Sequence, residues 1–214
     1  MNFYVSIIRP ILRGRDIKRY GYEFADLYLI NTHNGIKSKN IPPVDINEYP
    51  AIKKHLDKYW DKISKRDDKG DTPYNLRNCI YTDLFLEQNI VWQRITHQNT
   101  FCLSDKGFCI LDSMAFINCD ETYKYLLLAV LNSSLMYFYF KKVTTNYGEA
   151  GFRLSNQFVE MTPVPNHISN ELNKFVKIVL SNADNQLIKE IDLIVSELYN
   201  LSKYEKEYII KNYK

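Results

Sequence analysis

The sequence of 214 residues predicts an α/β fold, in which a mixed sheet-and-helix domain is followed by a C-terminal helical appendage. Before residue 120, short runs of β-branched and aromatic residues alternate with polar turns, which is typical of strands. After residue 167, apolar residues recur at helical spacing. Between these parts, Pro163-Val164-Pro165 closes the first unit. We therefore expect one domain over residues 1–166 and an appendage over residues 167–214 that packs on it.

The N-terminal part is expected to contain two strands and one helix. The strands are predicted over Phe3–Ile8 and Asp26–Asn31, with an arginine-rich segment between them that forms a loop or a short helix. Pro50 suits the first position of a helix. The apolar residues that follow it fall on one helical face, namely Ile52, Leu56, Tyr59, Trp60 and Ile63. A charged loop then runs over Lys65–Asp71.

The middle of the chain predicts strands over Asn89–Thr96, Thr100–Ser104 and Phe108–Asn118. Asp105-Lys106-Gly107 has the residue types of a hairpin turn.

Helices are expected to dominate the remainder. Asp120 can cap a helix from about Glu121 to Lys141 that is interrupted near Asn132-Ser133-Ser134. A flexible polar loop is predicted over Thr144–Arg153. Residues 168–213 are expected to be helical throughout, and Ser202 with Glu205 forms a capping box that opens the last helix.

Composition limits the partners and the compartment. The 28 basic and 25 acidic residues give a net charge of only +3, so affinity for nucleic acid would have to come from a local patch. The four cysteines lack CxxC spacing, which argues against a zinc site and suits a reducing compartment. The longest uncharged run, Tyr125–Phe140, is shorter than a membrane span and contains Asn132-Ser133-Ser134. The N-terminus lacks a signal-peptide pattern. We expect a soluble cytoplasmic protein with no membrane partner.

Arginine is concentrated in one segment, which holds Arg9, Arg13, Arg15 and Arg19 of the chain's eight arginines. A guanidinium group can bind phosphate or guanine through two parallel hydrogen bonds, which a lysine cannot do. The segment therefore predicts a nucleic-acid contact. The alternative is a solvated turn with surface ion pairs.

Four sequence blocks occur in a characteristic order: Arg9-Pro10-x-Leu12-Arg13-Gly14-Arg15-Asp16-Ile17, Tyr49-Pro50 to Gly70, Leu131-Asn132-Ser133-Ser134-Leu135, and Met161-Thr162-Pro163-Val164-Pro165. Their order and spacing resemble the TaqI-like C-terminal specificity domain. That module is the target-recognition domain of adenine-specific DNA methyltransferases and of fused type IIG restriction-modification enzymes. The third and fourth blocks are also similar to the recognition domains of type I specificity subunits.

The resemblance implies sequence-specific recognition of double-stranded DNA, with no cofactor and no catalysis in this chain alone. It also implies a methyltransferase catalytic domain, in cis or in trans, that binds S-adenosylmethionine and methylates adenine. Magnesium and DNA cleavage would be added where a nuclease accompanies the methyltransferase. The Asn-Pro-Pro-aromatic motif of the catalytic half does not occur here, since Asn40-Ile41-Pro42-Pro43-Val44 does not match it.

The candidate DNA-binding residues fall into three groups. The arginine segment supplies Arg13, Arg15, Lys18 and Arg19, while Arg9 is left out because it can turn inwards. Asp16 in the same segment can orient an arginine, accept a hydrogen bond from cytosine, or cap a helix. A strand supplies Gln93, Arg94 and Thr96, of which Gln and Arg are the types that bind adenine and guanine edges, although an ordinary solvent face is the alternative. Loops that could wrap the duplex supply Lys65, Arg66, Asn146, Tyr147 and Arg153.

Two other functions are weighed against DNA recognition. A magnesium-dependent nuclease needs an acidic residue two positions before a lysine, and Asp16-Ile17-Lys18 and Asp67-Asp68-Lys69 both match this half of the pattern. Such matches arise by chance in a chain rich in Asp and Lys. A helical protein-interaction module is favoured only if the basic segments lie on different faces.

Overall fold

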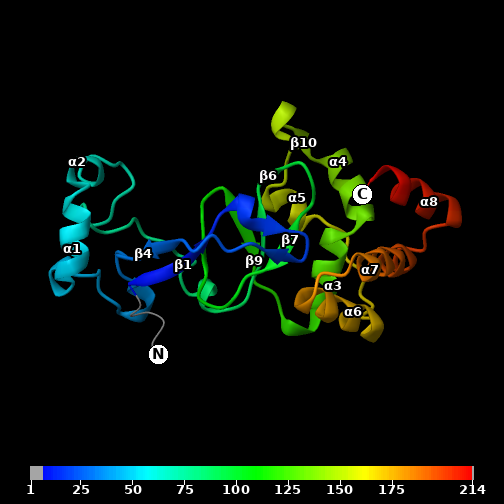
Figure 1. Ribbon diagram of the computed structural model, residues 1–214, viewed down its shortest axis with the longest axis horizontal. Helices are drawn as coiled ribbons and strands as arrows, with labels where there is room; N and C mark the ends of the chain where they lie inside the picture. The colour runs from blue at the N-terminus through cyan, green and yellow to red at the C-terminus, as the bar shows by residue number, and fades with distance from the viewer. Residues whose placement is uncertain (1–6, 214) are drawn as a thin grey trace.

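A computed structural model describes residues 7–213 of the chain. The molecule is elongated, with helices α1 (Pro50–Asp57) and α2 (Trp60–Ile63) at one end and helix α8 (Lys203–Asn212) at the other (Figure 1). Small sheets lie between these ends, so the predicted mixed α/β class with C-terminal helices is confirmed. None of the helices within residues 7–213 is long and apolar enough to cross a membrane.

The central sheet is built on strand β5 (Ile90–Gln93), which pairs antiparallel with β7 (Phe101–Leu103) on one side and β9 (Met114–Ile117) on the other. Ile90, Val91 and Trp92 are all buried, because both faces of this sheet are covered. The indole Nε1 of Trp92 donates to the carbonyl oxygen of Leu154 at 2.8 Å. The sheet is thereby tied to a segment about sixty residues further along the chain.

Three smaller sheets surround it. In the first, β1 (Ile8–Leu12) pairs antiparallel with β4 (Tyr28–Ile30) and parallel with β8 (Cys109–Ile110). The second pairs β2 (Ile17–Lys18) with β3 (Gly21–Tyr22), and the third has the order β10 (Thr145–Asn146), β11 (Phe152–Arg153), β6 (Ile95–Thr96).

Several strands of the structure differ from the predicted ones in their bounds or their pairing. Phe3–Ser6 of the first predicted strand lie outside the described residues, and β1 begins at Ile8. The predicted strands over residues 89–96 and 108–118 are each divided between two sheets. The hairpin predicted at residues 105–107 is wrong, because β7 pairs with β5 whereas β8 pairs with β1. Buried Arg9 of β1 donates to the carbonyl oxygen of Gly107, which draws this turn towards β1.

The long helices begin at the predicted residues. The Asp120 side chain accepts from Thr122 N at 2.7 Å and caps α3 (Glu121–Asn132), and the predicted interruption separates α3 from α4 (Ser134–Val143). The single helix predicted after Pro50 is two helices, α1 and α2, because Tyr59 leaves the helical conformation with ψ 15°. The loop predicted over residues 144–153 is instead the β10–β11 hairpin, which is joined by a 3₁₀ turn over Gly148–Ala150.

The C-terminal residues form α6 (Asn170–Ser181), α7 (Asn185–Leu198) and α8, after a short helix α5 (Asn156–Glu160). The predicted Ser202–Glu205 capping box is present. Figure 1 shows α6 and α7 beside α3. One apolar core joins them, since buried Leu126 and Val130 of α3 cluster with Val176 of α6 and Val195 of α7. The division at residue 166 into two domains stays a prediction.

Candidate nucleic-acid interface

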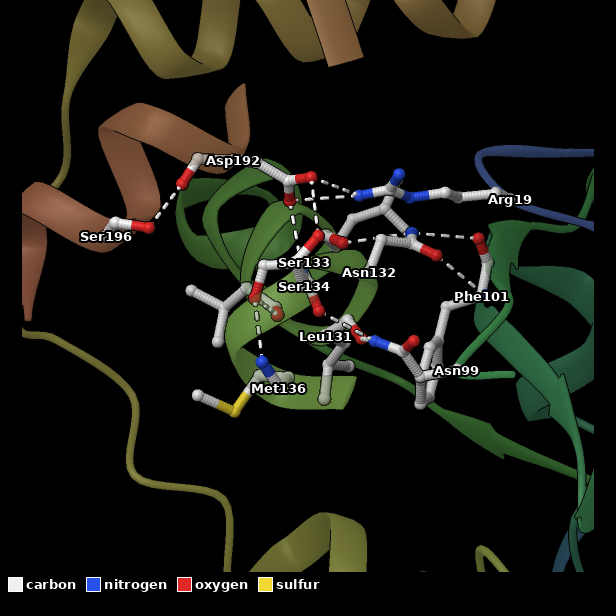
Figure 2. Close-up of polar contacts among 12 residues, drawn as sticks. Arg19, Asn99, Phe101, Leu131, Asn132, Ser133, Ser134, Met136, Asp192 and Ser196 are labelled. Atoms are coloured by element: carbon white, nitrogen blue, oxygen red, sulfur yellow. Dashed lines mark hydrogen bonds and ion pairs between the residues drawn. The ribbon is translucent and has the colours of Figure 1, made fainter. Parts of the chain in front are cut away.

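Side-chain hydrogen bonds are concentrated at the α3–α4 junction (Figure 2). The Asn132 side chain accepts from Phe101 N and donates to Phe101 O, both at 3.0 Å, so it pairs with β7 as a neighbouring strand would. Buried Asn99 donates to the carbonyl oxygens of Leu131 and Ser133. The Leu-Asn-Ser-Ser block therefore fixes the end of α3 to the central sheet, a role in the framework rather than at the surface.

The same junction connects to the C-terminal helices and to the arginine segment. Asp192 of α7 is buried and accepts from Ser134 N at 3.0 Å and from Ser134 Oγ at 2.9 Å. It also accepts from Arg19 Nη2 at 2.9 Å and 3.0 Å (Figure 2). Arg19, predicted to contact DNA, is thus engaged in an internal ion pair that links the turn between β2 and β3 to α7.

Arg13 and Asp16 form an ion pair within the arginine segment, in which both carboxylate oxygens accept hydrogen bonds. Arg13 Nη2 donates to Asp16 at 2.7 Å, Arg13 Nε donates to both carboxylate oxygens at 3.1 Å, and Arg13 N donates at 2.9 Å. The hydrogen bonds from the Arg13 side chain hold the pKa of Asp16 below its ordinary value. Asp16 is buried, so among its three predicted roles it orients an arginine and caps the 3₁₀ turn Gly14–Asp16. The pair orients Arg13 without using its Nη1, whose N–H groups can bind another acceptor.

The arginine segment and the β5–β6 segment come together at Gly14. A side-chain carbon on residue 14 would lie 2.7 Å from Gln93 Cγ and Cδ, so the Gln93 side chain lies against the glycine backbone. Only glycine leaves this space without displacing Gln93. Two of the three predicted groups of DNA-binding residues are therefore adjacent. Arg15 and Lys18 on this segment are exposed, and Lys18 pairs with Glu23 at 3.3 Å across an exposed surface.

The β10–β11 hairpin pairs with the β5–β6 segment through β6. Thr96 is opposite Phe152 in the β6–β11 pairing, and Ile95 is opposite Arg153. Phe152 and Leu154 are buried on either side of Arg153, so alternation along the strand directs Arg153 to solvent. Asn146 and Tyr147 at the turn of the hairpin are exposed, and Asn146 Oδ1 accepts from Gly148 N at 3.1 Å.

Arg94 and Thr96 between these groups are half-buried. The backbone of Arg94 holds the segment in place, since its N–H donates to Ser113 O at 3.0 Å and its carbonyl accepts from Leu154 N at 2.6 Å. Arg94 Nε is buried and has no hydrogen-bond partner within residues 7–213. Thr96 Oγ1 donates to Gln98 O at 2.7 Å and shapes the following turn.

Lys65 and Arg66 lie apart from this cluster, at the α1–α2 end of the molecule. Arg66 Nη2 donates to the carbonyl oxygens of Asn75 and Pro73, at 2.6 Å and 3.2 Å, and closes the loop between them. Lys65 is exposed. The structure places the segments that carry ten of the thirteen predicted residues next to one another, through Gly14 against Gln93 and through the β6–β11 pairing. Lys65 and Arg66 lie apart, and Arg19 faces α7. Contact of these residues with DNA stays a prediction.

The carboxylates of the nuclease alternative occupy separate segments. Both Asp16 oxygens accept from Arg13, and Lys69 Nζ of the second match donates to the carbonyl oxygen of Ser64 at 3.1 Å. Among residues 7–213 no three histidine, cysteine or acidic side chains are close enough together to bind a metal ion.

Residues 9–164 match the family model of the TaqI-like C-terminal specificity domain. The match covers well over half of the chain, so the chain belongs to this family. Its members are the DNA-recognition domains of restriction-modification enzymes, which assigns DNA recognition to this protein. Comparison with curated proteins finds no match.

Sequence reasoning missed Asp192 as a partner of both Arg19 and Ser134. The acid occurs within an amphipathic helix, where a polar residue ordinarily faces solvent. The available signal was its position between Ile191 and Val195, both of which are fully buried. An acidic side chain beside such residues requires internal partners.

Proposed function

We propose that this chain reads a specific double-stranded DNA sequence and presents it to a separate catalytic domain that methylates adenine. The observation that carries the proposal is the cluster formed by the Arg13–Lys18 segment, the Gln93–Thr96 segment and the β10–β11 hairpin within a DNA-recognition family. Three elements from distant parts of the chain meet there. Each contributes side chains of the types that bind phosphates or base edges.

The cluster contains two kinds of DNA contact. Exposed Arg15 and Lys18 lie on short, turn-rich backbone and are suited to phosphates, which position a protein without reporting sequence. Gln93 and Arg153 are on strands, where backbone pairing limits their freedom, and we assign them to base edges. Arg13, held by Asp16, is oriented before DNA binds, which reduces the entropy lost on binding.

The catalytic partner belongs to the proposal as well. A methyltransferase domain, in the same polypeptide or in another one, would bind S-adenosylmethionine and flip the target adenine out of the duplex. In a type IIG arrangement a nuclease domain with magnesium would cleave the same DNA. The part of this chain is to hold the duplex in register for that domain, in the cytoplasm where the DNA is found.

Selection from a random duplex library, followed by sequencing of the bound fraction, tests the proposal on the full chain. We expect enrichment of one short motif. Gln93→Ala or Arg153→Gln should relax the preference at one or two positions, at a cost of about 1–3 kcal/mol on the selected site. Lys18→Ala should weaken binding to all sequences and reduce the log–log salt slope by about 0.9. Lys203→Ala, on an exposed part of α8, is the control. Absence of any enriched motif and of any duplex binding would contradict the proposal.

A further inference from the structure

Helices α1 and α2 carry a lysine face that the cluster described above does not include. Lys54, Lys58, Lys62 and Lys65 are all exposed, at spacings of four, four and three residues. Such spacings keep side chains on one side of a helix. Turns connect α1 to α2, because Lys58 N donates to His55 O and Tyr59 N donates to Leu56 O. Lys54 and Lys58 are therefore neighbours one turn apart at the end of α1, and Lys62 and Lys65 are neighbours at the end of α2.

The unit contacts the rest of the protein through Tyr74. Trp60 packs against the ring of Tyr74 with centroids 5.3 Å apart, and the Tyr74 hydroxyl donates to Asp57 at 2.5 Å. Asp57 also accepts from Lys53 at 3.1 Å, so this acid already has two partners. The acidic side chains at helical spacing from the four lysines are Asp57 and Asp61. The excess of positive charge is local on a chain of net charge +3.

The unit is held rigidly at one end of the molecule. Arg66 closes the loop after α2 on the carbonyl oxygens of Pro73 and Asn75, and Asn75 Nδ2 donates to Val44 O at 2.9 Å. Figure 1 shows α1 and α2 at the end of the long axis opposite α8, with the central sheet between them. A fixed row of cations separated from the reading cluster suits a long, regular polyanion better than a small ligand.

We propose that the α1–α2 lysine face, Lys54, Lys58, Lys62 and Lys65, binds the phosphate backbone of duplex DNA beyond the base pairs that the cluster reads. The inference rests on the proposed function. Lysine is a mobile point charge, so these contacts add affinity without sequence preference. Their effect is to extend the footprint of the domain along the duplex and to fix its orientation.

Charge-neutral substitution of the face tests the inference. The variant is Lys54→Gln/Lys58→Gln/Lys62→Gln, and the control is Lys189→Gln/Lys203→Gln/Lys211→Gln, which removes three exposed lysines from α7 and α8. Gln and Lys have similar helix propensities, and circular dichroism verifies that both variants fold. Fluorescence anisotropy is measured against salt on two duplexes of unrelated sequence, each in a series of lengths.

We expect the face variant to reduce the log–log salt slope by about 2.7 on both sequences, corresponding to three lost phosphate contacts. The affinity difference from the wild type should shrink as the duplex is shortened, whereas the loss caused by Arg153→Gln should persist at every length. The control variant should keep the wild-type slope.

Other outcomes separate the two proposals. One outcome is that Arg153→Gln lowers the duplex affinity while the face variant keeps the salt slope and affinity of the control variant. In that case the lysine face is not a DNA contact and the proposed function stands. If the wild type binds no duplex, both proposals fail. Binding to phosphatidylserine vesicles that the face variant loses, with DNA binding unchanged, would assign the face to a membrane surface and overturn this inference.

Discussion

Arg19 and Asp192 are 173 residues apart in the sequence, yet Arg19 Nη2 donates to both carboxylate oxygens of Asp192, at 2.9 Å and 3.0 Å. Asp192 lies outside the region that matches the family, and Arg19 and Ser134, its two partners, lie inside it. The ion pair therefore ties the C-terminal helices to the family domain. It also fixes the turn that follows Lys18, one of the proposed phosphate contacts.

Removal of this carboxylate should destabilise the fold. Asp192→Ala leaves Ser134 N–H and Oγ and the Arg19 guanidinium without their acceptor. Breaking a buried ion pair costs about 3–5 kcal/mol, and we expect about 2–3 kcal/mol here because the Arg19 side chain is 31% exposed. Urea unfolding measures the loss. Glu207→Ala, which breaks an exposed 4.0 Å pair with Lys203, should change stability little. Equal losses in the two variants would show that the Asp192 contacts are not stabilising.

The contacts at Gly14 connect structure to sequence preference. Gly14→Ala should displace Gln93, whose Cγ and Cδ lie where the new methyl group would be. Because Gln93 is a flexible side chain rather than backbone, the stability cost should stay small while base preference relaxes as it does in Gln93→Ala. The double variant should add no further change, which identifies a shared mechanism. Gly21→Ala, where nothing lies within 4 Å, is the matched control. Additive effects on the selected motif would contradict the assignment of Gln93.

Acid should weaken the Arg13–Asp16 pair. The pKa of Asp16 is lowered in the folded chain, chiefly by hydrogen bonds from Arg13, from an ordinary value of 3.8. Its contribution to stability is therefore present above that value and is lost as the pH falls through the lower folded pKa. Asp16→Asn should reduce stability near neutral pH and flatten the loss of stability below about pH 4. Unfolding curves between pH 2 and pH 6 test this. If the stability of Asp16→Asn falls with acid as steeply as that of the wild type, other carboxylates govern the acid dependence.

The sequence predicts those parts of this fold that depend on local signals. Asp120, the Ser133 break and the Ser202–Glu205 box are capping patterns within a few residues of the backbone groups they satisfy. Long-range relations leave no comparable pattern. Nothing near Arg19 indicates an acid in α7, and nothing near Arg66 indicates that its acceptors are backbone carbonyls. The sequence therefore predicts both arginines as DNA contacts from their residue type and from the basic residues around them, and these contacts stay a prediction.

The β10–β11 hairpin was predicted as a flexible loop for a similar reason. Its strands have two residues each, and they are stable because Phe152 and Leu154 are buried and because β11 pairs with β6. Periodicity over two residues carries no signal. The glycines in this segment suggest flexibility, whereas the structure uses one of them, Gly151, for a close contact between strands.

Substitution of Gly151 should therefore detach the hairpin from β6. Gly151 has φ +97°, and an added Cβ would lie 2.2 Å from the carbonyl oxygen of Thr96, a backbone atom that cannot move aside without breaking the sheet. Gly148 also has a positive φ, of +62°, but nothing lies within 4 Å of an added Cβ. A left-handed alanine costs about 1–2 kcal/mol. Gly151, with ψ -127°, lies outside the left-handed helical region, so Gly151→Ala adds both a larger backbone strain and the steric conflict. Gly148→Ala is therefore the milder control at the same turn.

Amide hydrogen exchange over residues 145–154 measures local opening of the hairpin. We expect protection of Leu154 N–H, which donates to Arg94 O at 2.6 Å, to fall far more in Gly151→Ala than in Gly148→Ala. Duplex affinity should fall to the level of Arg153→Gln, because a detached hairpin no longer holds Arg153 beside the Gln93–Thr96 segment. Combining Gly151→Ala with Arg153→Gln should produce no further loss. If Gly151→Ala frees the hairpin but leaves duplex affinity and site preference intact, the hairpin is not part of the DNA-reading surface.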